Sequence, residues 1–155
     1  MGNAVQKLNL SKSLYTKGLQ CEKALWLKKY NPEVLTPPSL QLQAVFKTGN
    51  EVGALACDLF PGGKEVPFKG TSFKEKISLT QKWLDEGVRT IYEATFSFDD
   101  ILVMVDILHQ NENGSFEIYE VKSSTWNQKK SIDDIYKYIH DVSIQYFVLT
   151  GLGYN

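Results

Sequence analysis

The feature that most constrains the fold is a run of three strand-like segments between residues 89 and 124. β-Branched and aromatic residues fill the first segment, RTIYEATFSF, and the second, DDILVMVDILHQ, is almost wholly apolar, as is typical of a central strand. The segment NENG, with Asn113-Gly114, supplies a hairpin turn, and SFEIYEVKSS pairs back as the third strand. This run therefore predicts a three-stranded antiparallel meander.

Helical periodicity appears on both sides of this meander. Ser11 or Ser13 can cap a first helix, which Gly18 can break before a second helix that includes residues 24–27. Three prolines make residues 31–39 a loop.

A long helix is expected over residues 40–59, with its apolar residues along one side. Further helices are expected over 72–87 and 131–153, each with glycine as its stop. Helices, a meander and a final helix predict an α+β fold in a single domain, residues 1–155.

Composition excludes several classes of protein. Hydrophobic residues make up 43% and charged residues 23% of the 155 residues, as in globular proteins. The net charge of −1 means that any binding to nucleic acid must come from a local patch. The sequence shows no membrane-spanning run or signal peptide, so we expect a cytoplasmic protein without membrane contact. Cys21 and Cys57 are too few for a disulfide scaffold and are expected to be reduced.

Three charged residues in the meander suggest chemistry. With the turn at Asn113-Gly114, Asp106 is expected opposite residue 121 to within a residue or two, next to Glu120 and Lys122. Two neighbouring carboxylates repel one another unless a cation lies between them, and Mg²⁺ or Mn²⁺ takes such oxygen ligands. The carbonyl of Val121 is a further candidate ligand, and the lysine can stabilise a phosphate or an attacking water. The set predicts a metal-dependent site for phosphodiester hydrolysis.

The same residues resemble a known signature. Asp106, thirteen intervening residues and then Glu120-Val121-Lys122 resemble the PD-(D/E)XK nuclease motif, in the strand–turn–strand setting of that superfamily. SLYTKGLQCEKALWLKKY resembles the N-terminal segment of RecB-like and CRISPR-associated exonucleases, and QYFVLTGLG resembles their Gln-Tyr helix motif. The resemblance implies a restriction-endonuclease-like core, α-β-β-β-α-β, whose last strand is missing here. The chain is accordingly expected to be either naturally short or the N-terminal fragment of a longer protein.

The resemblance also implies roles for individual residues. Asp106 and Glu120 match the metal-binding acids, and Lys122 matches the catalytic lysine. Gln145 and Tyr146 match the helix motif that faces the site and the DNA in relatives.

Other positions depart from the family's pattern. Gly53 stands where many relatives have a histidine that completes the metal shell, so Glu51 becomes a candidate ligand and Glu93 its competitor. Cys21 matches one ligand of an iron–sulfur cluster found in some relatives, but the other three cysteines are absent and no cluster is expected.

The expected function is Mg²⁺- or Mn²⁺-dependent hydrolysis of DNA, with a further C-terminal domain or a second copy of the chain as candidate partners. Two alternatives remain open: a nucleic-acid-binding or assembly module that keeps the fold without cleaving, and an interaction domain in which the charged residues form a salt bridge. The N-terminal lysines are either a solvated face or a phosphate-contacting patch; they are Lys12, Lys17, Lys23, Lys28 and Lys29.

Overall fold

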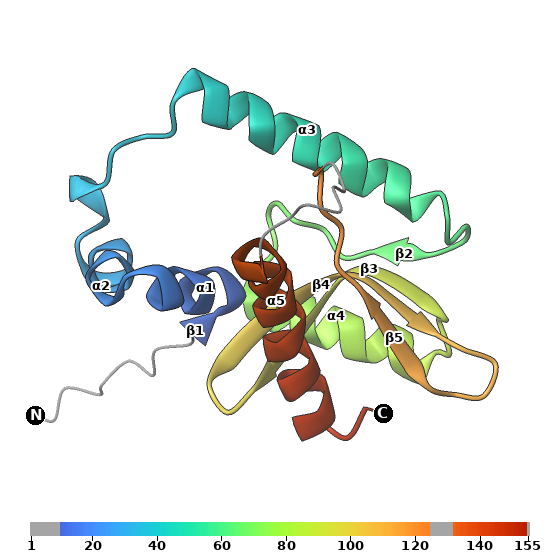
Figure 1. Ribbon diagram of the computed structural model, residues 1–155. Helices are drawn as coiled ribbons and strands as arrows, with labels where there is room; N and C mark the ends of the chain where they lie inside the picture. The colour runs from blue at the N-terminus through green and yellow to red at the C-terminus, as the bar shows by residue number, and fades with distance from the viewer. Residues whose placement is uncertain (1–9, 125–131, 155) are drawn as a thin grey trace, which may run out of the picture.

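The computed structural model describes residues 10–124 and 132–154, which form a mixed α+β fold around a curled mixed sheet (Figure 1). The elements are, in chain order, β1 (Leu10–Ser11), α1 (Lys12–Gln20), α2 (Glu22–Tyr30), the 3₁₀ helix η1 (Pro32–Val34), α3 (Leu40–Cys57), β2 (Lys64–Glu65), α4 (Phe73–Asp85), β3 (Thr90–Phe98), β4 (Ile101–Gln110), β5 (Phe116–Tyr119) and α5 (Ile132–Gly151).

The predicted meander is present as β3, β4 and β5, which pair antiparallel in sequence order. Asp99 and Asp100, both at positive φ, form the tight turn between β3 and β4. Two strands of two residues each were not predicted: β1 pairs parallel with the start of β4, and β2 pairs parallel with β3. The sheet order is therefore β1-β4-β3-β2, with β5 also on β4.

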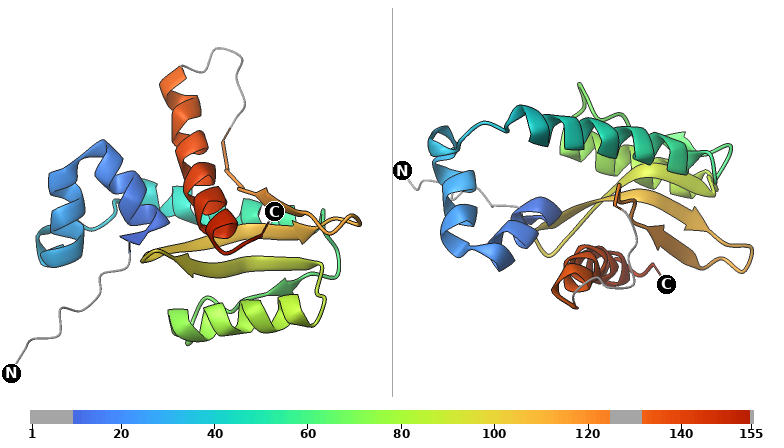
Figure 2. Two further views of the ribbon diagram at one scale, coloured as in Figure 1. Left: turned by 90° about the horizontal axis from the view of Figure 1, so that it is seen from below. Right: turned by 45° about the horizontal axis from the view of Figure 1, so that its top comes forward.

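Helices cover both faces of the sheet, with α5 on one face and α4 on the other (Figure 2, left). The apolar core lies between these layers. Its buried members are Val66, Ile91, Ala94, Phe96, Val103, Val105, Leu108, Ile144, Val148 and Leu149.

The long helix expected over residues 40–59 is present as α3, but none of its residues is buried. Leu40, Val45 and Leu55 are more than half exposed, so the apolar side of this helix is not packed into the core of the described residues. Its C-terminal end is tied to the sheet by Tyr92, whose hydroxyl donates to the carbonyls of Cys57, at 3.2 Å, and Phe60, at 2.5 Å.

Local signals at helix ends were mostly read correctly. Ser11 caps α1 by accepting from the N–H of Leu14, and Gly87, at a φ of +75°, follows the end of α4. Gly18 does not break α1; the helix continues through it to Gln20, and Cys21 is its C-terminal cap. None of the helices in the described ranges is long and apolar enough to cross a bilayer.

Candidate active site

The site is centred on a gap along one edge of β4. β1 pairs with this edge at Ile101 and Leu102, whereas β5 pairs with it from Ile107 onward. β1 runs parallel to β4 and β5 runs antiparallel, so the two chains approach each other head-on across the gap. The residue after β1 and the residue after β5 therefore meet beside Asp106, and these are Lys12 and Glu120.

The Glu120 carboxylate lies in this gap, with a side chain that is only 5% exposed. Lys12 Nζ donates to its two oxygens at 2.9 and 2.7 Å, and Lys122 Nζ donates to Oε1 at 2.5 Å. Gln145, from α5, donates to Oε2 at 2.7 Å. These four contacts match the roughly four lone-pair sites that a carboxylate offers.

Asp106 sets the end of the third strand. Its Oδ2 accepts from the backbone N–H of Val121 at 2.7 Å, where a strand would pair with a backbone carbonyl. The prediction of a strand over 115–124 was therefore too long, since β5 ends at Tyr119. Ile107 pairs with Tyr119, which places Asp106 level with Glu120 and shifts the expected register by one residue.

Glu93 stands next to Asp106 on the other side. The pairs Tyr92–Ile107 and Ala94–Val105 flank this position, so the register places Glu93 directly across from Asp106. The φ angle of Glu93 is +56°, which is rare for a residue other than glycine and strained within a strand. A strained backbone at the level of the central acid points to a functional constraint rather than to packing.

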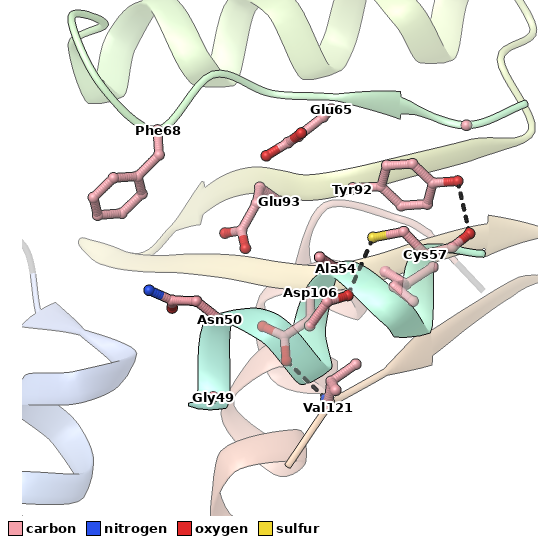
Figure 3. A pocket seen from close by; sticks show the side chains of 13 residues that line it. Gly49, Asn50, Ala54, Cys57, Glu65, Phe68, Tyr92, Glu93, Asp106 and Val121 are labelled. Atoms are coloured by element: carbon pink, nitrogen blue, oxygen red, sulfur yellow. Dashed lines mark hydrogen bonds between the residues drawn. The ribbon is translucent and has the colours of Figure 1, made fainter. Parts of the chain in front are cut away.

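Glu93 and Asp106 line a pocket of about 760 Å³ between the sheet and α3. Figure 3 shows their carboxylates and that of Glu65 pointing into this space. Small residues of α3 form the opposite wall, among them Gly49 and Gly53. The carboxylate of Glu120 does not line the pocket; it is turned toward α1 and α5, with Asp106 between it and Glu93.

The three carboxylates influence one another's protonation. Burial, and then the charge of Asp106, raise the pKa of Glu93 above its usual value. Burial, and then the charge of Glu120, raise the pKa of Asp106. Burial also acts to raise the pKa of Glu120, but the ammonium groups of Lys12 and Lys122 outweigh it and lower that pKa. The pocket therefore presents two acids whose ionised forms lack a sufficient counter-charge.

Lys122 is held from two sides. Its Nζ contacts Glu120 and, at 2.7 Å, Oδ2 of Asp141 on α5. Burial acts to lower the pKa of Lys122, but its bonds to Asp141 and Glu120 outweigh this and raise it. Lys122 is therefore a fixed cation rather than a proton donor.

Gln145 is fully buried, and its Oε1 has no hydrogen-bond partner in the part of the chain that the structure describes. Its Nε2 donates to Glu120 and to the carbonyl of Asp141. A buried, unpaired amide oxygen beside the carboxylates is a polar group suited to a water or to a group of the substrate.

Two predicted site residues lie elsewhere. Glu51 faces away from the pocket, with a side chain that is 61% exposed and 3.9 Å from Lys47. Tyr146 is 64% exposed and lines a shallow apolar groove on α5. Cys21 is an exposed thiol where α1 meets α2.

Sequence reasoning missed three polar residues around the acids. Lys12 was grouped with the other N-terminal lysines, and only the gap in the sheet brings it to Glu120. Glu65 falls between the helices expected over 40–59 and 72–87, and Asp141 falls within the helix expected over 131–153; neither was a candidate site residue. No local signal in the sequence marks any of the three.

The donor set suits a hard cation, because Asp106 and Glu93 offer carboxylate oxygens and Val121 lines the same pocket. Burial is the main cause that raises the pKa of both acids, and a cation beside them would act in the opposite direction. Within residues 10–124 and 132–154, no group of three or more His, Cys, Asp or Glu side chains could hold an ion. Asp106 and Glu93 are therefore the residues that could hold an ion such as Mg²⁺ or Mn²⁺, which needs only one or two carboxylates when waters and other oxygens complete its shell.

Comparison with known proteins gives no further guidance: no family model, curated protein or solved structure matches this chain.

Proposed function

We propose that this chain is a metal-dependent nuclease domain of the PD-(D/E)XK type, with a restriction-endonuclease-like core, that hydrolyses phosphodiester bonds of DNA. The observation that carries the proposal is the meeting of Glu93, Asp106 and Glu120 at one level of three neighbouring chain segments, with Lys122 beside them. Simple salt-bridge formation does not account for the arrangement, because Glu93 and Asp106 have no ammonium within ion-pair distance in the described residues.

The proposed roles follow from position. Asp106, with Glu93 or Glu120, holds the ion, which supplies charge for the phosphate and activates water. Lys122, anchored by Asp141, stays charged and stabilises negative charge that develops on the phosphate. Gln145 orients Glu120 through its amide. Exposed Lys23 and Lys28 on α2 supply the local positive charge that contact with a nucleic-acid backbone requires.

A second function is favoured by a specific observation. All four donor contacts of Glu120 come from protein groups, and its carboxylate lies outside the pocket. This arrangement suits a nucleic-acid-binding or assembly module that keeps the fold without cleaving.

Cleavage of labelled single- and double-stranded DNA in Mg²⁺, Mn²⁺ or EDTA distinguishes the two functions. Nuclease function predicts metal-dependent cleavage that falls by at least about a hundredfold in Asp106→Asn and Lys122→Met. Glu117→Gln, an exposed acid on β5, is the matched control and should cleave like the wild type. Equal cleavage by the wild type and both site variants would exclude this site, whereas DNA binding without turnover would support the second function.

A further inference from the structure

Lys12 occupies an unusual position for a lysine at the first turn of a helix. It follows β1 directly, and its ammonium contacts both oxygens of Glu120 across a sequence separation of 108 residues. The side chain is only 20% exposed, so the pair is largely removed from solvent. Its charge also acts on Asp106 and Glu93, so one ammonium influences all three carboxylates.

Lys12 and Lys122 differ in how they are held. Lys122 contacts both Glu120 and Asp141, and therefore keeps one carboxylate when the other is taken by another cation. Lys12 has Glu120 as its one ion-pair partner among the described residues. Any cation that binds Glu120 must displace one of the groups that donate to this carboxylate. Lys122 and Gln145 each also contact Asp141, whereas Lys12 has no second acidic partner among the described residues.

We propose that Lys12 is a built-in counter-cation for Glu120, so that a divalent ion beside Asp106 can take Glu120 as a further ligand only by displacing the Lys12 ammonium. The inference rests on the proposed function, because it concerns the same ion. It goes beyond that function by assigning a residue outside the Asp…Glu-x-Lys pattern to the control of metal binding. Glu120 is then neutralised by the chain itself until the concentration of the ion is high enough to compete with Lys12.

The test measures Mn²⁺ affinity by calorimetry on the full chain without DNA, at fixed pH and ionic strength. Lys12→Met keeps an unbranched side chain one atom shorter and removes the competing charge, so Mn²⁺ should bind about tenfold more tightly than to the wild type. Lys17→Met, on the same helix, changes the net charge equally and should stay close to the wild type. Equal affinity of the two methionine variants, or weaker binding by Lys12→Met, would overturn the proposal.

A measurement on the wild type needs no substitution and covers the case in which Lys12→Met fails to fold. Brief acylation of amines, read by peptide mass spectrometry, should label Lys12 several-fold faster with saturating Mn²⁺ than in EDTA, while Lys17 is unchanged. Unchanged or slower labelling of Lys12 in Mn²⁺ would overturn the proposal.

The two proposals fail in different ways. If neither the wild type nor any variant binds Mn²⁺, the metal-dependent function fails and the Lys12 inference fails with it. If the wild type binds Mn²⁺ and cleaves DNA while Lys12→Met binds like Lys17→Met, the nuclease assignment stands and only the role of Lys12 is lost.

Discussion

Replacing Glu93 by glycine is expected to give a more stable protein than replacing it by alanine, which reverses the usual order in a strand. Both substitutions remove the buried carboxylate, so its raised pKa and its repulsion with Asp106 cancel from the comparison. The two variants then differ in stability only through the backbone at residue 93, because a φ of +56° suits glycine and strains alanine.

The size of the difference follows from two opposing terms. The left-handed conformation costs roughly 1–2 kcal/mol for a residue with a Cβ atom. Glycine loses more backbone entropy than alanine on folding, which costs about 0.5–1 kcal/mol. The net advantage of glycine at position 93 is therefore about 0.75 kcal/mol, which corresponds to a Tm higher by about 2 °C in a chain of this length.

Calorimetric melts of Glu93→Gly and Glu93→Ala measure this difference directly. Glu117 provides the control, since it lies on β5 with an exposed side chain and without a positive φ. At position 117 alanine should be the more stable by about 0.5–1 kcal/mol. If alanine is also the more stable at position 93, the backbone there is not strained and the functional reading of that strain is wrong.

Three further predictions concern the acids and the packing of two glycines. The pKa of Asp106 is raised in the folded state, so its favourable contribution to the free energy of unfolding is present at low pH and is lost as the pH rises. Urea melts should therefore show Asp106→Asn gaining stability relative to the wild type between about pH 4 and about pH 7. Mn²⁺ affinity measured by calorimetry should weaken between about pH 7 and about pH 5, because protons on Glu93 and Asp106 compete with the ion. In the same melts, Gly151→Ala should lower the free energy of unfolding by about 1–3 kcal/mol, since its Cβ would lie 2.3 Å from the Phe98 ring. Gly53→Ala should raise the free energy of unfolding by up to about 1 kcal/mol, because its Cβ would meet no atom within 4 Å.

The meander was predictable because its signals are local. Runs of apolar and β-branched residues and one Asn-Gly turn fixed three strands and their pairing to within one residue. That register was enough to bring Asp106 beside Glu120 and Lys122 before any coordinates were considered.

The surroundings of the acids were not predictable, because they depend on contacts between distant segments. β1 and β2 have two residues each, too few for any periodicity to show. Without β1, nothing in the sequence distinguishes Lys12 from the neighbouring lysines. The apolar residues of α3 repeat at helical spacing, but their period does not reveal whether a core lies beside them.

The candidate site lies where the sheet stops being regular, and the two irregularities flank the same residue, Asp106. On one side of Asp106, Glu93 leaves strand geometry; on the other, the carboxylate of Asp106 takes the N–H of Val121 and ends β5. Both changes arrange acids around one level of β4, and both work against folding, since strain and buried charge cost free energy. A divalent ion that bound these acids in the folded chain, as the proposed function requires, would offset that cost and raise stability with its concentration. The proposal therefore predicts that a substitution that relieves the cost also weakens the binding of the ion.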